Sequence, residues 1–247
     1  MSASRDDLKG IVLAGGLGTR LGPLTKITNK HLLPIYNKPM IYYPISQLAR
    51  AGIKDIVVVT GGQHAGEFLR LLGNGNHFGL THLNYTYQEG EGGIAQALGL
   101  AKHFAQHKKT VVILGDNIFE HDLKPYIDRF RRQKAGARLL LKKVPDPERF
   151  GVAELRGKKI VSIVEKPKKP KTDLAVTGVY MYDENVFDII RTLKPSARGE
   201  LEITDVNNAY LKRGQLEYDL LKGWWTDSGT FDSLLHANVL VARQSPK

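Results

Sequence analysis

The sequence predicts an α/β fold in which three layers are formed by a mostly parallel sheet with helices on both of its faces. Short apolar runs alternate with segments of helical periodicity through the first half of the chain, the order expected for such a sheet. The runs are continuous rather than alternating, as is typical of strands buried on both faces. With 247 residues and no internal repeat or flexible linker, the chain fits one large domain.

The first half contains the predicted parallel strands and the helices between them. The apolar run at residues 10–14 ends in glycines and forms the first strand. A helix that follows is stopped by Gly52, which is a common helix terminator. We predict strands at residues 10–14, 56–60, 83–87 and 111–114, and helices at residues 40–51, 63–72, 94–104 and 123–133.

From Leu139 onward the pattern changes to shorter strands. Turn signals at Asp146-Pro147, Arg156-Gly157 and Pro167 separate them. This stretch indicates an insertion that extends the sheet rather than a separate domain. The remaining predicted elements are a strand at residues 176–182 and helices at residues 185–193, 203–213 and 231–243, the last capped by Thr230.

Composition narrows the class of protein. Hydrophobic residues at 42% and charged residues at 25% are typical of a globular protein. The sequence has no apolar stretch long enough to cross a bilayer, and charged residues at Arg5, Asp6 and Asp7 precede the first apolar run. We therefore expect no membrane span, no secretory signal and a cytoplasmic location. The absence of cysteine excludes disulfides and a thiol nucleophile.

The formal net charge of +11 favours an anionic partner. Residues 138–171 contain eleven basic and four acidic residues, including the lysine run from Lys166 to Lys171. Such a run is typical of a solvated loop, and this is our interpretation of its lysines other than Lys166. The charge alone does not choose between nucleic acid, a membrane surface and small phosphorylated substrates. The interleaved aromatic residues or recognition helix that nucleic-acid modules usually carry are not evident beside it.

A glycine cluster follows the first strand, at residues 15–21 (Gly-Gly-Leu-Gly-Thr-Arg-Leu). In an open α/β sheet, ligands bind at the carboxyl ends of the strands. Glycines let several backbone N–H groups approach a phosphate, and the guanidinium of Arg20 can bind the same phosphates. The spacing fits neither the dinucleotide fingerprint nor the P-loop. A glycine-rich turn without a ligand is the alternative interpretation.

Further motifs follow the glycine cluster in an order that resembles the sugar-1-phosphate nucleotidylyltransferases, and among them the glucose-1-phosphate thymidylyltransferases. Each motif alone is weak, but the ordered set is specific and spans nearly the whole chain. The motifs are residues 29–34 (NKHLLP), 92–97 (GGIAQA), 114–117 (LGDN), 146–152 (DPERFGV), 165–167 (EKP), 176–180 (VTGVY), 199–205 (GELEITD) and 225–230 (WTDSGT).

The resemblance implies a Rossmann-like sheet with a small β-rich sugar-binding insertion, in one domain spanning residues 1–247. The nucleotide-binding half would be residues 9–137 and the sugar-phosphate-binding half residues 138–243. The implied reaction condenses dTTP with glucose 1-phosphate to give dTDP-glucose and pyrophosphate, by Mg²⁺-dependent direct displacement at the α-phosphate. The family also implies a homo-oligomer and a role in carbohydrate biosynthesis, as in the formation of dTDP-rhamnose.

The resemblance further implies a role for individual residues. Arg20 would stabilise charge at the α-phosphate, Lys30 would hold the departing pyrophosphate, and Lys166 would contact the phosphate of the nucleophile. Asp116 and Asp227 would bind Mg²⁺. The implied nucleotide contacts are Leu13, Ala14, Gly15, Gly16, Gly18, Thr19, Gln88, Gly93 and Asp116, and the implied sugar phosphate contacts are Phe150, Gly151, Glu165, Lys166, Val176 and Tyr180.

The chemistry of these residue types agrees with the implied metal site. Asp116 directly follows a predicted buried strand, level with the glycine cluster if the sheet is parallel. Mg²⁺ takes oxygen ligands and usually binds only one or two protein carboxylates beside substrate phosphates. The alternatives are a turn residue for Asp116 and a helix cap for Asp227.

Gln88 carries a carbonyl and an amide donor, which together match the edge of thymine or uracil. It cannot sense the methyl group that distinguishes the two bases, so UTP remains an alternative to dTTP. An exposed polar residue at a strand end is the other interpretation of Gln88. We interpret His31, His64 and His82 as structural or surface residues, and Trp224 and Trp225 as packing residues.

Several features leave alternatives open. The same reaction with UTP or another sugar 1-phosphate, a non-catalytic sugar-nucleotide sensor and a basic nucleic-acid-binding protein are the rival functions. The best-known family members carry a longer carboxyl-terminal helical extension, which puts any effector site that depends on it in doubt. Phe150 stands where tyrosine is frequent, and Glu89 and Glu91 have no predicted role.

Overall fold

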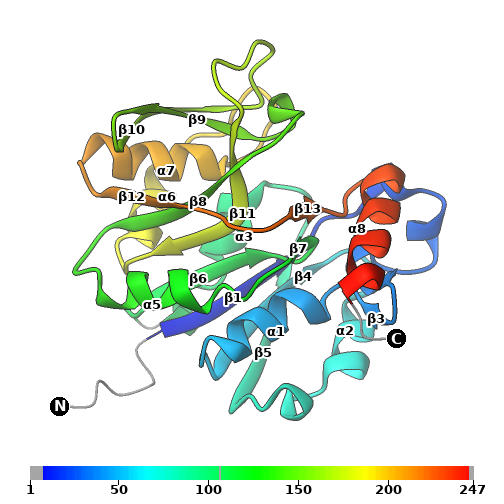
Figure 1. Ribbon diagram of the computed structural model, residues 1–247. Coiled ribbons are helices and arrows are strands. Elements are labelled where there is room, and N and C mark those ends of the chain that lie inside the picture. Colours follow the sequence, from blue (N-terminus) through cyan, green and yellow to red (C-terminus); the bar gives the residue numbers. More distant parts are fainter. Residues whose placement is uncertain (1–7, 106, 245–247) are drawn as a thin grey trace.

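A nine-stranded sheet runs through the computed structural model, which describes residues 8–105 and 107–244 (Figure 1). The expectation about a secretory signal rests partly on Arg5, Asp6 and Asp7. These three residues lie outside the described ranges. The main path of the sheet has the order β10-β9-β11-β6-β1-β4-β5, and β8 and β12 join it through β11. The strands are β1 (Leu8–Ala14), β4 (Asp55–Gly61), β5 (His82–Gln88), β6 (Lys109–Leu114), β8 (Ala137–Lys143), β9 (Gly151–Arg156), β10 (Lys159–Glu165), β11 (Leu174–Tyr182) and β12 (Leu216–Leu220).

The centre of the sheet is parallel, as predicted. β1 lies between β4 and β6, and β5 lies outside β4, with all three pairings parallel. The carboxyl ends of β1 and β6 are in register at Leu13 and Leu114, so the residues that follow them start from the same edge. This edge holds the glycine cluster and Asp116.

The second half of the chain extends the sheet with antiparallel pairings. β11 is buried along its whole length and runs antiparallel to β6. It also pairs with β8 and β9, and the register shift between Val176 and Tyr180 lets it serve both partners. β9 and β10 form a hairpin that turns at Gly157, which has a φ of 62°. The β-rich extension predicted from residue 139 onward is therefore present.

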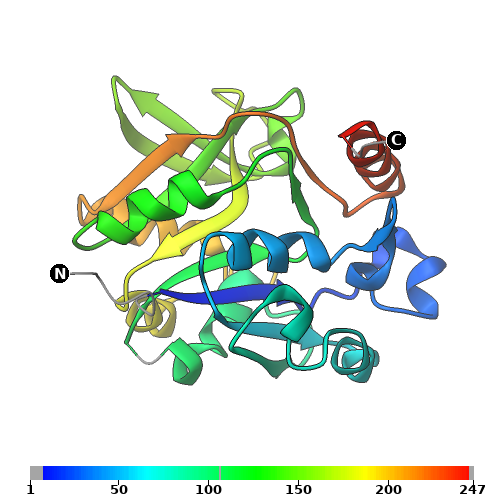
Figure 2. The ribbon, with the colours of Figure 1, turned by 60° about the horizontal axis from the view of Figure 1, so that its bottom comes forward.

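Two groups of helices cover the two faces, which confirms the three-layer prediction (Figures 1 and 2). The odd positions of β1, such as Ile11 and Leu13, pack with one group, and the even positions, such as Val12, pack with the other. The first face carries α3 (Ile94–Gly99), α4 (Lys102–Ala105), α6 (Val186–Thr192) and α7 (Ile203–Lys212), and the second carries α1 (Tyr42–Arg50), α2 (Ala65–Leu72) and α5 (Lys124–Arg132).

The last helix, α8 (Phe231–Gln244), packs at the side of the molecule beside the segment that carries Leu21 and Ile35 (Figure 1). A short antiparallel pair, β7 (Asn117–Phe119) with β13 (Trp225–Asp227), joins the end of β6 to the start of this helix. A further short pair consists of β2 (Pro34–Ile35) and β3 (Lys38–Pro39). Among the described residues, no helix is both long and apolar enough to cross a membrane.

The predicted helix at residues 94–104 is wrong as a continuous helix. It consists of α3 and α4, separated at Leu100 and Ala101. Gly99 ends α3, since glycine favours helix ends, and a Cβ at this position would lie 3.3 Å from Ile190 of α6. Thr230 caps α8 as predicted, because Ser233 donates its backbone N–H to Thr230 Oγ1 at 3.2 Å.

Candidate active site

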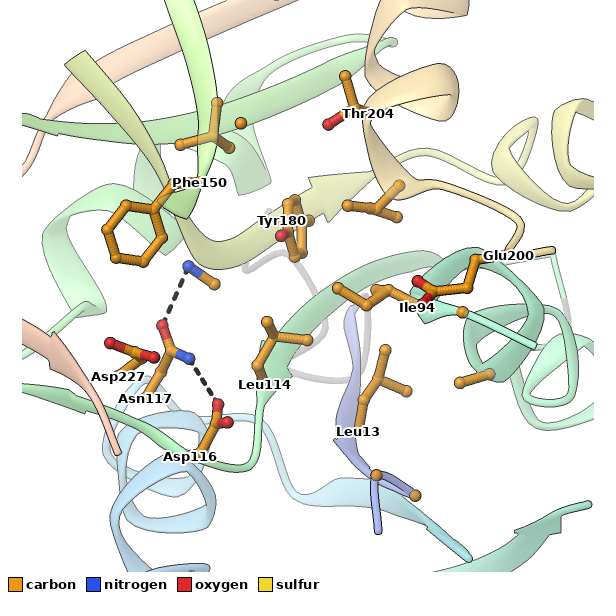
Figure 3. A pocket seen from close by; sticks show the side chains of 18 of the residues that line it. Leu13, Ile94, Leu114, Asp116, Asn117, Phe150, Tyr180, Glu200, Thr204 and Asp227 are labelled. Carbon is orange, nitrogen blue, oxygen red and sulfur yellow. Dashed lines mark hydrogen bonds between the residues drawn. The ribbon is translucent and has the colours of Figure 1, made fainter. Parts of the chain in front are cut away.

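A cavity of about 530 Å³ opens at the carboxyl ends of β1, β5 and β6, between the parallel half of the sheet and the β9–β11 extension (Figure 3). This is the edge at which an open α/β sheet binds its ligands. Most residues that the sequence singled out lie on its wall. They are Leu13, Gly15, Gly16, Arg20, Lys30, Gln88, Gly93, Asp116, Phe150, Gly151, Glu165, Lys166, Val176, Tyr180 and Asp227.

Gly15, which starts the glycine cluster, lies close against its neighbours because glycine has no side chain. A Cβ on Gly15 would collide with the Gln88 carboxamide, and one on Gly61 would lie 2.6 Å from the carbonyl oxygen of Gly15. The backbone N–H of Leu17 donates to Glu91 Oε1 at 3.2 Å. Glu91, for which the sequence suggested no role, thus anchors the loop to the segment that leads to α3.

Three residues predicted to contact the nucleotide are not on the cavity wall. Ala14 is fully buried in β1. Gly18 has a φ of 68° and packs against Lys30, where a Cβ would lie 2.8 Å from the lysine Cβ. Thr19 begins a 3-10 helix, Thr19–Leu21, that carries Arg20 toward the cavity. Ala14, Gly18 and Thr19 therefore shape the loop, and their predicted contact with the nucleotide stays a prediction.

Asp116 extends from the end of β6 and is paired with Lys30. Lys30 Nζ donates to Asp116 Oδ2 at 2.6 Å, and each side chain is only 13% exposed. Asn117 Nδ2 donates to the other oxygen at 2.8 Å. Burial opposes ionisation of Asp116, but the nearby Lys30 ammonium and these hydrogen bonds outweigh it and hold the pKa of the carboxyl well below its usual range. Asp116 is therefore a carboxylate at neutral pH.

Asn117 is a site residue that sequence reasoning missed. Its Oδ1 accepts from the Gly178 backbone N–H at 3.0 Å and from Trp225 Nε1 at 2.7 Å (Figure 3 shows the first of these bonds and the bond to Asp116). A Cβ on Gly178 would collide with the Asn117 carboxamide. Asn117, the first residue of β7, thus links β11 and β13 next to Asp116. Its place in Gly-Asp-Asn suggested only a turn, because Gly178 and Trp225 are distant from it in sequence.

The β7–β13 pair brings Asp227 next to Asp116. Asp227 lies opposite Asn117 in the pairing, and Ser228 donates its backbone N–H to the carbonyl oxygen of Asp116 at 2.9 Å. Figure 3 shows both aspartates on the same side of the cavity. Thr230, not Asp227, caps α8, so the helix-cap interpretation of Asp227 is wrong.

Asp227 has a cationic partner that the sequence did not suggest. Arg149 Nη2 donates to both Asp227 oxygens, at 2.8 and 3.0 Å, while Nη1 donates to Asp146 Oδ2 at 2.6 Å. Arg20 also lies near Asp227, since both side chains approach Gly229. A Cβ at Gly229 would lie 3.0 Å from Arg20 Nη2 and 3.3 Å from Asp227 Oδ2. Burial and the charge of Asp116 nevertheless raise the pKa of Asp227.

The two aspartates fit a hard divalent cation. They supply oxygen ligands only, their negative charges repel each other, and each is balanced by one cationic side chain, Lys30 or Arg149. Mg²⁺ suits such a pair because it needs only one or two protein carboxylates when phosphates complete its shell. Within residues 8–105 and 107–244 there is no cluster of three or more histidine or acidic residues that would suit zinc.

The opposite wall of the cavity is built by β9, β10, β11 and α7. Thr204 Oγ1 donates to Glu165 Oε2 at 2.5 Å, which fixes the carboxylate. The Phe150 ring packs on Trp225 with centroids 5.0 Å apart, so Trp225 is a packing residue as predicted. Burial, with smaller contributions from Glu165 and Asp116, raises the pKa of Tyr180, which keeps its hydroxyl neutral.

Lys166 is the exposed basic residue of this wall. Its φ of 41° is uncommon for a residue other than glycine, and its backbone N–H donates to the Phe150 carbonyl at 3.0 Å. Its ammonium has no partner within the described part of the chain, unlike those of Lys30 and Lys171. Of the four lysines in the basic run, Lys166 is the one that lines the cavity.

Gln88 is buried at the end of β5, not exposed. Its Nε2 donates to the Gly93 carbonyl at 3.3 Å and to Gln96 Oε1 at 2.8 Å. Both amide hydrogens are thus used within the protein, and only Oε1 faces the cavity as an acceptor. The expectation that Gln88 offers a base both a donor and an acceptor is therefore wrong.

His31 also reaches the cavity wall, although it is buried. Its Nδ1 lies 2.7 Å from Asn29 Oδ1, and burial followed by the charge of Lys30 lowers its pKa to about 3. The buried, neutral imidazole is held by Asn29 and lies near the charges of Lys30 and Asp116, which agrees with its structural interpretation. Further lining residues, which were not among the predicted ligand contacts, are Gly90, Glu91, Ile94, Ala97, Leu114, Asn117, Arg149, Gly178, Glu200, Ile203, Thr204, Asn207 and Trp225.

Together, the parallel sheet, the glycine loop and the paired aspartates define a protein that binds a phosphorylated ligand at a cationic, metal-compatible site. Residues 9–244 match the family model described as nucleotidyl transferase. The chain belongs to this nucleotidyl transferase family.

Relatives extend the match over almost the whole chain. A glucose-1-phosphate thymidylyltransferase from Neisseria meningitidis is 46% identical over 95% of this chain and 82% of its own length. One from Mycolicibacterium smegmatis is 48% identical with the same coverage.

Solved structures agree with these sequence matches. A Bacillus anthracis protein assigned provisionally as a glucose-1-phosphate thymidylyltransferase, in complex with a sucrose, has a TM-score of 0.92 and 55% identity over 97% of each chain. A UDP-glucose pyrophosphorylase complexed with UDP-glucose has a TM-score of 0.83 and 25% identity, over 96% of this chain and 99% of its own.

Proposed function

We propose that the chain is a glucose-1-phosphate thymidylyltransferase that condenses dTTP with glucose 1-phosphate to give dTDP-glucose and pyrophosphate. The observation that carries the proposal is the juxtaposition of Asp116 and Asp227 at the glycine loop, facing Lys166 and Glu165 across one cavity. The similarity to curated enzymes of that name supports the choice of substrates.

The proposed reaction needs no general base and no protein nucleophile. The phosphate oxygen of a sugar 1-phosphate is already ionised at neutral pH, so it attacks the α-phosphorus directly. Catalysis then rests on alignment and on neutralisation of charge. Arg20 would stabilise the α-phosphate, and Lys166 would hold the phosphate of the nucleophile.

Asp116 and Asp227 would hold Mg²⁺, which when bound supplies positive charge that offsets repulsion between the two anionic substrates. Lys30 lies beside Asp116 and behind the glycine loop, where it would bind the departing pyrophosphate. The backbone N–H groups after β1 would hold the triphosphate. Glu165, fixed by Thr204, would bind hydroxyls of the sugar.

A second candidate is the same reaction with UTP. The acceptor of Gln88 serves the ring N–H of uracil and thymine alike, and a UDP-glucose pyrophosphorylase shares the fold. We further propose a cytoplasmic homo-oligomer that acts on small phosphorylated substrates and binds neither nucleic acid nor membrane. In this proposal the chain is one domain with the two halves at residues 9–137 and 138–243, and its product enters carbohydrate biosynthesis.

The test is pyrophosphate release from glucose 1-phosphate with dTTP, UTP, CTP, ATP or GTP, with Mg²⁺ and then with EDTA. We expect rapid, Mg²⁺-dependent release with dTTP, and the ratio to UTP decides between the two candidates. No release with any triphosphate or sugar 1-phosphate would leave a non-catalytic sugar-nucleotide sensor as the better account.

A further inference from the structure

The orientation of the Gln88 carboxamide is determined by its neighbours. A backbone carbonyl can only accept hydrogen bonds, so the Gln88 atom that faces the Gly93 oxygen at 3.3 Å must be the nitrogen. The same Nε2 lies 2.8 Å from the Gln96 side chain, which must therefore present its oxygen. Gln96 completes the set of acceptors that keeps the Gln88 nitrogen turned away from the cavity.

Gln96 is itself held in place. It lies on α3, and its carboxamide rests against the backbone of Gly92, where any Cβ would collide with it. It is partly buried and lies behind Gln88, outside the cavity wall. Gln96 therefore acts only through Gln88, as a positioning residue.

The remaining polar atom of this pair is Gln88 Oε1. It lies against the backbone of Gly15, and both residues line the cavity. Within the described residues Oε1 accepts no hydrogen bond from the protein, and it is not sealed away from the cavity. Gln88 therefore offers one fixed acceptor, Oε1, on the cavity wall near the glycine loop. It offers no donor beside that acceptor, because its nitrogen is bonded to Gly93 and Gln96.

We propose that Gln96, by fixing this acceptor, makes the nucleotide site select a base that carries a ring N–H and reject cytosine. The inference rests on the proposed function and deepens it. Uracil and thymine have a hydrogen on N3, which can donate to Gln88 Oε1. Cytosine has a lone pair on N3, which would face the oxygen lone pairs. A site built around one hydrogen bond rejects an analogue that cannot make it, because its polar group is then left unpaired.

The test compares Gln96→Met with Gln96→Glu. Methionine has a similar length but no oxygen acceptor, so the Gln88 nitrogen keeps only its longer bond, 3.3 Å to the Gly93 carbonyl. The carboxamide is then held less strongly and can turn its nitrogen toward cytosine more easily. Glutamate retains an acceptor for Gln88 Nε2 and serves as the matched control. Equilibrium affinities for UTP and CTP, which share the ribose and triphosphate, are measured by calorimetry with Mg²⁺ and without sugar phosphate, and thermal unfolding checks the fold.

We expect the natural protein and Gln96→Glu to prefer UTP, and Gln96→Met to lose that preference by roughly fivefold, the worth of one hydrogen bond. The inference would be overturned if a folded Gln96→Met variant kept the natural ratio of UTP to CTP affinity, or if both variants lost the preference for UTP equally. The proposed function would not be affected by either result. If the natural protein binds UTP and CTP equally, the inference also fails while the proposed function stands. If it binds no nucleotide, both fail.

Discussion

Lys30 Nζ lies 2.6 Å from Asp116 Oδ2, so one of the two proposed Mg²⁺ ligands carries a built-in cationic partner. The other, Asp227, is paired in the same way with Arg149. Each carboxyl group therefore has a cationic partner in place before any metal or phosphate arrives, which offsets part of the repulsion that raises the pKa of Asp227. We expect the phosphates of the substrates to replace the two carboxylates as partners of Lys30 and Arg149, while the carboxylates bind the metal.

Replacing Lys30 by methionine should destabilise the fold in a pH-dependent manner. The substitution leaves Asp116 as an unpaired buried carboxylate, which costs about 3 kcal/mol in the free energy of unfolding at neutral pH. The pKa of Asp116 is lowered in the folded protein, so its stabilising effect is present above the unfolded pKa and is lost as acid protonates the group. Urea unfolding should show the difference from the natural protein shrinking below about pH 4. A difference that is constant with pH would contradict this explanation.

Replacing Arg149 by glutamine should strengthen binding of a divalent cation in the absence of nucleotide. The change frees both oxygens of Asp227 from their partner. Arg149 is partly exposed, so the gain in affinity for Mn²⁺, measured by electron paramagnetic resonance, should be modest, roughly threefold. Arg149→Lys keeps the positive charge and should show less gain. Weaker Mn²⁺ binding in Arg149→Gln would argue against competition between Arg149 and the metal.

Replacing Asn117 by alanine should cost both stability and activity. The buried N–H of Gly178 and the partly buried indole N–H of Trp225 would lose their acceptor, and Asp116 would lose a donor. We expect a loss of about 2 kcal/mol or more in the free energy of unfolding. Asn208→Ala removes a single bond, to the carbonyl of Ile163, and serves as the comparison. Equal stability losses in the two variants would refute the proposed role of Asn117 next to Asp116.

Replacing Glu91 by alanine should loosen the glycine loop. The lost acceptor for Leu17 N–H lies at the surface, so the melting temperature should change little. The KM for the triphosphate should rise by roughly threefold, while Glu91→Gln, which retains an acceptor oxygen, should behave like the natural protein. If both variants lose affinity equally, the charge of Glu91 matters rather than the bond.

Much of the fold could be predicted because its signals are local. The apolar runs of β1, β4 and β6 and the glycines after β1 are contiguous in sequence, and each implies its own geometry. The break between α3 and α4 was missed, although Gly99 at the end of α3 is itself a local signal for a helix end. The three-residue strands β7 and β13 are too short to carry a periodic signal.

The site was predicted less completely, because its geometry depends on contacts between distant residues. The meeting of Asp116 and Asp227 follows from the pairing of β7 with β13, which no local pattern shows. Arg149 and Asn117 act through partners that are far away in sequence. The orientation of Gln88 depends on Gly93 and Gln96. Its residue type alone suggested that the amide nitrogen is free to donate to a base, whereas both of its hydrogens are used within the protein.

The most direct test of the account follows radiolabelled glucose 1-phosphate into product in the presence of dTTP and Mg²⁺. The natural protein should convert the label to dTDP-glucose, identified by chromatography. Asp116→Asn and Asp227→Asn, checked to be folded, should each lose at least about a hundredfold in rate, because each removes a charged ligand at the reacting phosphate. Full activity in either variant, or no labelled nucleotide sugar from the natural protein with any triphosphate, would contradict the account.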